Sequence, residues 1–418
     1  MRRLTHTLER ILYARPLTPV IIETTRRAWA EVKRFVEELV PPRLLKPFVR
    51  DRVFIKRLLG IIEQPLVIQQ EIPMFNMIGA LLPSRLVDEV ASQSGVEKLY
   101  LDRLVWALPF EHPVTGVECI STWETKELLG VRVANEEGWT GKGVKVFVLD
   151  TGVRKSLNPV RHVKVRTAIP LKGGTGLDSV GHGTFCAAII GGRRWRDPVL
   201  GVETEGMAPD AAIVSVQVLG FGVGVGMTSD IIKGIEIAIL GGADIINLSL
   251  GAFVYPSLDE DPYHKAVDKA VEVGTLVVAA VGNERDILCT PGALPSVIAV
   301  GATSLRGYVS HFSSRGTYAG TVKPDVVSYG ENIYAPTVGL METTDKMFQR
   351  AGVLSGTSFA APHVAGMLAC AVQMFREHGE ELNREVFEEV CRRYGHAKRI
   401  PDGYGLIRFD WFRNYLGV

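Results

Sequence analysis

The feature that most constrains the fold is a series of apolar, strand-length segments that alternate with helical patterns after about residue 120. The segments predicted as strands are Val144–Leu149, Ile213–Leu219, Ile245–Leu250, Thr275–Val281 and Val297–Val300. The helical patterns are Ser229–Leu240, Tyr263–Val273 and a long one over about 358–377. Strands that are apolar on both faces and separated by helices predict a parallel sheet covered by helices on both sides.

Composition narrows the functional classes. The formal net charge of +1 gives no electrostatic reason to expect nucleic acid or an anionic membrane as a partner. The five cysteines form no C-x-x-C pair, which argues against a disulfide framework and against a thiolate metal site. Two uncharged runs, Ala211–Ser229 and Ile287–Leu305, have the length of a membrane span. Glycines or prolines interrupt both, so we interpret them as buried strands and loops and expect no membrane span.

Residues 1–110 have a different organisation from the rest of the chain. The pattern predicts a strand at Pro19–Thr24, a helix at Arg26–Val40, two strands within 65–83, a helix at 84–95 and a strand at 96–108. The order β-α-β-β-α-β is that of a ferredoxin-like α+β domain. No group of titratable residues stands out in it, so a folding or binding module without chemistry is the simplest interpretation.

Three segments carry residues suited to catalysis. Asp150 ends a buried strand in VFVLDTGV, at the carboxyl edge where α/β folds place their sites. His182 lies between two glycines at the start of an apolar helix. Ser358 stands at a helix start in LSGTSFAAPHVAG, with Pro362 in the first turn. Taken singly, each has a structural alternative: a turn residue, a structural histidine and a helix cap.

Together the three segments are far more specific, because a hydroxyl nucleophile needs a base and the base needs an acid to hold its tautomer. The motifs D-T-G, G-H-G-T and G-T-S-x-A-x-P-H-V-A-G, in the order Asp150, His182, Ser358, resemble the subtilisin-like serine peptidases over about residues 120–410. The resemblance implies an α/β subtilisin-like fold, an acyl-enzyme mechanism and these three residues as the catalytic triad.

The same resemblance assigns further residues. Asn283, in VVAAVGNE, matches the donor of the oxyanion hole. The glycine run Gly220–Gly226 fits neither G-x-G-x-x-G nor a phosphate-binding loop, and it is similar to the edge on which a peptide substrate pairs as an added strand. The substrate-binding residues expected on this basis are Gly224, Val225, Gly226, Ser249, Leu250, Gly251 and Gly282. Peptide specificity stays open.

Subtilisin-like precursors often carry a ferredoxin-like propeptide that assists folding and blocks the cleft. We therefore expect a propeptide at 1–110, a linker at 111–122 that is cut by the chain itself somewhere in 108–121, and a peptidase domain at 123–418. The expected partners are polypeptide substrates and the chain's own propeptide. Cys186 resembles the buried cysteine of the thiol-dependent branch, although a small core residue is an equal alternative.

The chemistry is expected to require no cofactor and no metal. A structural calcium ion is left open without a site, and the arginine-rich segment 191–206 argues against calcium there. The acidic run Asp259–Asp261 is interpreted as a solvated helix cap. Because the family is mostly exported while Met1–Arg15 shows no signal peptide, the compartment stays open, with cytoplasmic location or non-standard export as alternatives.

Two rival classes remain from the sequence. One is a catalytically silent binding protein with the subtilisin fold, and the intact residues Asp150, His182, Asn283 and Ser358 argue against it. The other is a nucleotide-binding oxidoreductase on a similar parallel sheet, and the failed glycine fingerprint argues against that.

Overall fold

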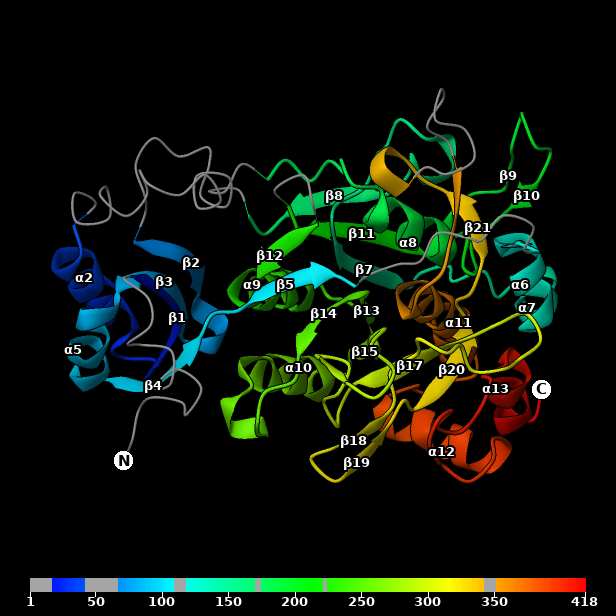
Figure 1. Cartoon of the computed structure of the whole chain (residues 1–418). Coiled ribbons are helices and arrows are strands. Elements are labelled where there is room, and N and C mark those ends of the chain that lie inside the picture. Colours follow the sequence, from blue (N-terminus) through cyan, green and yellow to red (C-terminus); the bar gives the residue numbers. More distant parts are fainter. Residues whose placement is uncertain (1–16, 42–66, 109–117, 170–173, 221–223, 342–350) are drawn as a thin grey trace.

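A computed structural model describes residues 17–41, 67–108, 118–169, 174–220, 224–341 and 351–418, and Figure 1 shows the whole chain. A small module built on an antiparallel sheet lies beside a larger α/β unit. Most of the segment predicted to contain the self-cleavage site, 109–117, lies outside the described residues. The predicted fold class, a parallel α/β unit preceded by a small α+β domain, is confirmed.

Seven parallel strands form the central sheet of the larger unit. In spatial order they are β20 (Val326–Tyr329), β17 (Ile298–Thr303), β15 (Leu276–Ala280), β13 (Ile245–Leu248), β7 (Lys145–Asp150), β11 (Ala212–Gln217) and β8 (Lys164–Thr167). Along β7, Val146 and Val148 face one hydrophobic core while Phe147 and Leu149 face another. This alternation explains why the strand is apolar on both faces.

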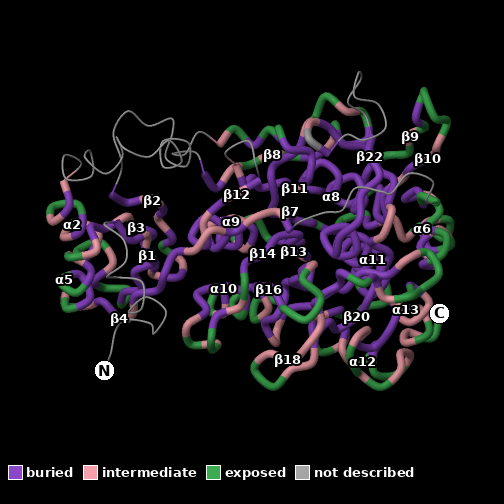
Figure 2. The backbone as a smooth tube through the Cα atoms, viewed as in Figure 1, coloured by how far each residue is buried: buried purple, intermediate pink, exposed green. Residues whose placement is uncertain are grey.

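Helices cover both faces of the sheet. The first core contains α8 (His182–Gly191) and α11 (Thr357–Glu377), and the second contains α9 (Thr228–Leu240) and α10 (Pro262–Glu272). Of the described helices, α11 alone has the length and apolar composition of a membrane span, and its apolar window is completely buried inside the protein. Figure 2 shows α11 as buried, so this helix forms the centre of the fold.

Further elements complete the larger unit. The helices are α6 (Thr122–Leu128), α7 (Val131–Glu136), α12 (Arg384–Tyr394) and α13 (Phe409–Leu416). The short strands are β6 (Ile120–Ser121), β9 (Trp195–Arg196), β10 (Glu203–Thr204), β12 (Val225–Met227), β14 (Leu250–Phe253), β16 (Cys289–Thr290), β18 (Gly316–Tyr318), β19 (Thr321–Lys323), β21 (Ile333–Pro336) and β22 (Ala351–Leu354). The capping box at Ser121 and Glu124 fixes the start of α6, close to the predicted domain start at residue 123.

The small module has the β-α-β-β-α-β order expected from the sequence. Its elements are β1 (Leu17–Thr24), α2 (Trp29–Leu39), β2 (Ile68–Ile72), β3 (Met77–Pro83), α5 (Val87–Ser92) and β4 (Val96–Leu101), in the sheet order β2-β3-β1-β4. Alternate residues of β1 separate its two faces, because Val20 and Ile22 pack with the module's own helices whereas Ile21 joins the core around α9 and α10. The module therefore docks on the larger unit through the face of its sheet that lacks helices.

The predicted strand 96–108 is divided in the structure into β4 and β5 (Leu104–Ala107). The break lies at Asp102, whose carboxylate accepts hydrogen bonds from the backbone nitrogen and the hydroxyl of Ser229 at 2.9 and 2.7 Å. These bonds cap the first turn of α9. Beyond the break, β5 leaves the module and runs across the larger unit (Figure 1).

Candidate active site

Asp150 and His182 form a buried pair at the carboxyl edge of the parallel sheet. The Nδ1 atom of His182 lies 2.8 and 2.9 Å from the two carboxylate oxygens of Asp150, and both side chains are completely buried. Asp150 Oδ1 also accepts a hydrogen bond from the backbone nitrogen of Thr151 at 2.7 Å. The Nε2 atom of His182 is buried and has no hydrogen-bond partner among the described residues.

Electrostatics of the pair favour a protonated imidazole. Burial alone would lower the pKa of His182, but the adjacent Asp150 carboxylate outweighs it and raises that pKa well above the ordinary value of 6.5. A hydrogen bond from Nδ1–H to the carboxylate leaves Nε2 as the atom that can accept and release a proton. The arrangement therefore suits a base that works from Nε2.

The two glycines beside His182 and the acid Asp178, which the sequence analysis missed, position His182. A side chain at Gly183 would overlap the carbonyl oxygen of Gly152, and one at Gly181 would overlap the carbonyl oxygen of Val338. The completely buried Asp178 accepts hydrogen bonds from five donors at 2.6 to 3.0 Å. The donors are Thr151 Oγ1, Val180 N, Gly181 N, Thr184 N and Thr184 Oγ1. An acid shortly before an apolar helix was the available sequence signal.

Ser358 is the second residue of α11 and does not cap it. Its hydroxyl donates to the carbonyl oxygen of Ser249 at 3.3 Å. The ring centroid of the next residue, Phe359, lies 5.6 Å from the ring centroid of His182. Pro362 lies inside the helix in its second turn, one turn later than expected. In a helix the Ser358 carbonyl would accept a hydrogen bond from the backbone nitrogen four residues later, but that residue is Pro362, which has no N–H group. The carbonyl accepts instead from Ser249 Oγ at 2.8 Å.

Asn283 is held in one orientation by Thr357, a residue that the sequence analysis did not single out. The backbone nitrogen and the hydroxyl of Thr357 lie 2.9 and 2.7 Å from Asn283 Oδ1. Since a backbone N–H group can only donate, the atom that it faces is the amide oxygen, and the amide nitrogen points elsewhere. A Cβ atom on Gly356 would lie 3.2 Å from that nitrogen, so the Asn283 donor is next to the start of α11.

The predicted cleft residues flank β5. Val225 and Gly226 of β12 pair antiparallel with Trp106 and Val105, and on the other side Leu250 and Gly251 of β14 pair with Ala107 and Trp106. The Gly224 carbonyl also accepts a hydrogen bond from the backbone nitrogen of Ala107 at 2.9 Å. The predicted substrate edges therefore hold an extended strand between them, and this strand belongs to the chain itself.

Glycine at these edges is required by backbone conformation at Gly224 and by close packing at Gly226. Gly224 has φ of +71°, a conformation that side chains disfavour, and a Cβ atom there would lie 3.4 Å from that of Ala107. A side chain at Gly226 would overlap the carbonyl oxygen of Val218. Ser249, also predicted to grip the substrate, bonds to Ser358 through both its hydroxyl and its carbonyl.

Leu108 follows β5 and fills an apolar pocket. It is 1% exposed and belongs to the same core as Cys289. A Cβ atom on Gly251 would lie 3.1 Å from Leu108 Cδ2 and 2.9 Å from Cys289 Cβ. A Cβ atom on Gly282 would lie 2.9 Å from the Cys289 sulfur. The absence of a side chain at Gly251 thus makes room for Leu108, and its absence at Gly282 makes room for Cys289.

Cys186 lies beside the catalytic candidates. Its sulfur is 3.9 Å from His182 Nδ1 and 3.5 Å from the Ser358 carbonyl oxygen, and burial raises the pKa of the thiol. Among the described residues, Asp150, His182 and Cys186 form the one group of three potential metal ligands, with their ligand atoms within 4.8 Å of one another. A thiol and an imidazole favour soft metals over calcium.

The expectation of a solvated cap at Asp259–Asp261 is partly wrong. Asp261 does cap α10, since its carboxylate accepts from the backbone nitrogen of Tyr263 at 2.9 Å. It is only 2% exposed, however, and also accepts from the Thr290 hydroxyl at 2.6 Å. Burial raises the pKa of Asp261 to about 6, because a carboxyl group removed from water is harder to ionise.

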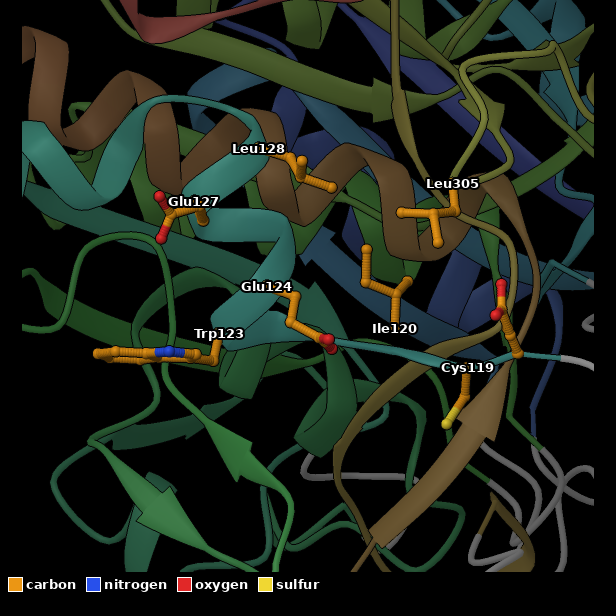
Figure 3. A pocket seen from close by; sticks show the side chains of 8 residues that line it. Cys119, Ile120, Trp123, Glu124, Glu127, Leu128 and Leu305 are labelled. Carbon is orange, nitrogen blue, oxygen red and sulfur yellow. The ribbon is translucent and has the colours of Figure 1, made fainter.

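A separate hollow lies at the start of α6. Figure 3 shows its lining, which consists of Glu118, Cys119, Ile120, Trp123, Glu124, Glu127, Leu128 and Leu305. None of the predicted site residues belongs to this lining. The hollow is therefore distinct from the cleft that β5 occupies.

Comparisons with known proteins agree with this geometry. The sequence profile of the subtilase family matches residues 141–392. The minor extracellular protease Epr of Bacillus subtilis is 33% identical over 291 residues, which cover 68% of this chain and 40% of the relative. The major intracellular serine protease of the same organism is 35% identical over 297 residues, or 67% of this chain and 86% of the relative.

Subtilisin E of Bacillus subtilis is 33% identical over 279 residues, which are 65% of this chain and 66% of the relative. The match to the family profile spans more than half of the chain and includes the segments of Asp150, His182, Asn283 and Ser358. This chain belongs to the subtilase family and is a subtilisin-like serine protease.

Proposed function

We propose that the chain is a serine endopeptidase made as a self-processing precursor, with Ser358 as nucleophile, His182 as general base and acid, and Asp150 as the group that orients the imidazole. The observation that carries the proposal is the Asp150–His182 pair, bonded at Nδ1 and unpartnered at Nε2. A silent binding protein would not need a buried, unpaired ring nitrogen, which costs free energy.

The proposed reaction follows the triad logic. Ser358 Oγ bonds to the carbonyl carbon of the peptide while its proton moves to His182 Nε2, and Asp150 stabilises the imidazolium. The carbon–nitrogen bond then breaks as the same proton passes to the departing amine. A water molecule repeats the two steps on the acyl-enzyme and releases the acid product, so no cofactor takes part.

Asn283 is proposed to stabilise the negative charge on the carbonyl oxygen. Thr357 occupies its amide oxygen and thereby orients the nitrogen as a donor toward the start of α11. The positive end of that long helix adds to the effect. One donor of this kind typically contributes about 3 to 4 kcal/mol to the lowering of the barrier.

The small module is proposed to be the inhibitory propeptide of this peptidase. Support comes from β5, which pairs with both predicted substrate edges, and from Leu108, whose buried side chain lies next to Gly251. Triad residues that are completely buried in the full chain fit a blocked precursor. Self-cleavage in 108–121 would release the larger unit.

Intact-mass measurement on purified full chain over time, together with a fluorophosphonate label, tests this proposal. Ser358→Ala should stop self-shortening and labelling, with a loss of peptide hydrolysis on the order of 10⁶, as for other triads that lose their nucleophile. The matched control is Ser355→Ala, three residues upstream, whose hydroxyl bonds only to Asn332 among the described residues. Self-shortening of Ser358→Ala near the wild-type rate would refute the assignment.

A further inference from the structure

Arg103, the residue before β5, binds to a site that we call the cation cradle. The cradle consists of the Tyr255 ring and the carbonyl oxygen of Phe253. The guanidinium carbon of Arg103 is 3.8 Å from the centroid of the Tyr255 ring, which is 2% exposed. One guanidinium nitrogen of Arg103 donates to the carbonyl oxygen of Phe253 at 3.3 Å. A cation over an aromatic face gains electrostatic stabilisation from the ring quadrupole. Both contacts cross from the small module to the larger unit.

The surroundings of the cradle are acidic and aromatic. Tyr318 has a buried hydroxyl without a partner among the described residues, and Asp261 is nearly inaccessible to water. Burial raises the pKa of both groups, and the positive charge of Arg103 opposes that rise. Such surroundings favour a cation over a neutral side chain.

The backbone around Arg103 is held as an extension of the strand pairing. Its carbonyl oxygen accepts from the backbone nitrogen of Thr228 at 2.9 Å and from the Thr228 hydroxyl at 3.3 Å. The next residue, Leu104, already pairs with Met227 of β12. Since any residue can make these main-chain bonds, an extended peptide bound in place of β5 would present its own side chain to Tyr255.

We propose that Tyr255 and the Phe253 carbonyl form a substrate subsite for a cationic side chain, best filled by arginine, at the sixth residue before the cleaved bond. The count takes Leu108 as the first residue, so Arg103 is the sixth. Arginine suits the site because its plane can stack on the ring while an N–H group reaches the carbonyl, whereas lysine can do only one of these well. The inference rests on the proposed endopeptidase function.

The test uses the purified chain after incubation, with self-shortening followed by intact mass. Three peptides carry arginine, lysine or norleucine before the common sequence Leu-Val-Trp-Ala-Leu-Ser-Glu, and their hydrolysis is followed by chromatography. We expect kcat/KM for the arginine peptide to exceed that for the norleucine peptide by about three- to tenfold, with lysine between them. High salt should reduce the ratio.

Two variants of Tyr255 separate the ring from its hydroxyl. Tyr255→Phe keeps the aromatic face and loses only the hydroxyl, whose bond goes to Leu101 of the small module, so it should keep the ratio. Tyr255→Leu should bring the ratio to about one. Equal hydrolysis of all three peptides by the wild-type chain would overturn the subsite and leave the endopeptidase function standing. No hydrolysis of any peptide would overturn both.

A folding defect in Tyr255→Leu would not remove the test, because the peptide ratio and its salt dependence are measured on the wild-type chain.

A matched experiment changes Arg103, the residue that binds at Tyr255 in the full chain. Arg103→Met should speed fluorophosphonate labelling of the full chain about three- to tenfold, and Arg103→Lys should speed it less. Labelling at equal rates in all three chains would contradict a cradle that binds the cation.

Discussion

The two units of this chain are built on sheets of different kinds, a parallel sheet in the larger unit and an antiparallel sheet in the small module, and they bury these sheets differently. The larger unit buries both faces of a parallel sheet, which brings Asp150, from the end of a strand, next to His182, from the start of a helix. The small module covers one face of an antiparallel sheet with its own helices and uses the other to dock on α9 and α10. The proposed chemistry therefore depends on fixed side chains, whereas the proposed inhibition would depend on a shared surface and one strand.

The largest effect should come from the chemistry of the larger unit alone. Asp150→Asn removes the charge that orients His182, and we expect kcat to fall by about 10⁴ while docking of the small module persists. Because Asp150 raises the pKa of His182 above 6.5, wild-type hydrolysis should rise with pH through that raised pKa. The variant loses the raising effect and keeps burial, which lowers the pKa, so its profile should move to lower pH.

The measurement is a pH series of kcat/KM on the self-shortened wild-type chain and on the variant, whose small module is removed by an unrelated protease that is then inactivated. A profile for Asp150→Asn that stays at the wild-type midpoint would show that the carboxylate does not control the ionisation of His182. Unchanged thermal unfolding of the full-length variant is the control for an intact fold.

The second effect should come from the small module alone. Val36 is completely buried in the module core, whereas Phe35, beside it on α2, is half-buried. Val36→Asp buries an unpaired charge, and we expect the module to lose about 3 to 5 kcal/mol of stability and to uncover Ser358. Fluorophosphonate labelling of the full chain should then be at least tenfold faster than in the wild type.

The exposed residue Glu38 on the same helix supplies the control, since Glu38→Asp should leave labelling unchanged. If Val36→Asp makes the module sensitive to an added protease while Ser358 labels at the wild-type rate, the module does not cover the cleft.

A third, smaller effect should show how the larger unit positions its base. Asp178→Asn keeps one oxygen as an acceptor and replaces the other by an NH₂ donor. In either orientation of the amide, this NH₂ group faces a backbone N–H group, that of Thr184 or that of Gly181. We expect a loss of about 2 to 3 kcal/mol in stability and a fall in kcat of about tenfold, with KM nearly unchanged. Chemical denaturation measures the loss of stability, and peptide kinetics measure the fall in kcat. A drop in stability without any change in kcat would make Asp178 purely structural.

The smallest effect on rate should come from Cys186. Cys186→Ala removes a thiol that no proposed step uses, so kcat/KM should stay within about threefold of the wild type. A mercurial should inhibit the wild-type enzyme, because metal on the Cys186 sulfur would displace the ring 3.9 Å away, and it should spare the variant. Cys289→Ala is the matched control, since that thiol lies at the pocket of Leu108. Equal inhibition of Cys186→Ala and wild type would assign the sensitivity elsewhere.

The sequence predicts the local features well, because they depend on neighbours along the chain. The alternation of apolar residues gives the strands and helices of both units, and the motifs bring the candidate residues of the triad into view. Features that depend on distant contacts were missed. The break at Asp102 follows from its bonds to Ser229, 127 residues later, and neither residue signals the other in the sequence.

The same reason explains the details of the site. Thr357 lies in a motif that was recognised, yet its role in orienting Asn283 depends on two segments that meet only in the fold. Asp261 belongs to an acidic run that is typical of a solvated cap, yet it is buried and accepts a hydrogen bond from Thr290, which belongs to another element. Burial of a polar side chain is therefore the property that local pattern predicts least well.

The register of β5 has a kinetic consequence for the precursor. With Leu108 in the pocket, the next bond along the chain joins it to Pro109, and that bond is a tertiary amide. The nitrogen of a proline carries a ring carbon where other residues carry hydrogen, and that bulk next to the bond slows its hydrolysis. As the proposed inhibitor, β5 should therefore stay in the cleft for a long time before it is cut, and Pro109→Ser should shorten that time. The sequence of the chain itself would thus delay its own activation.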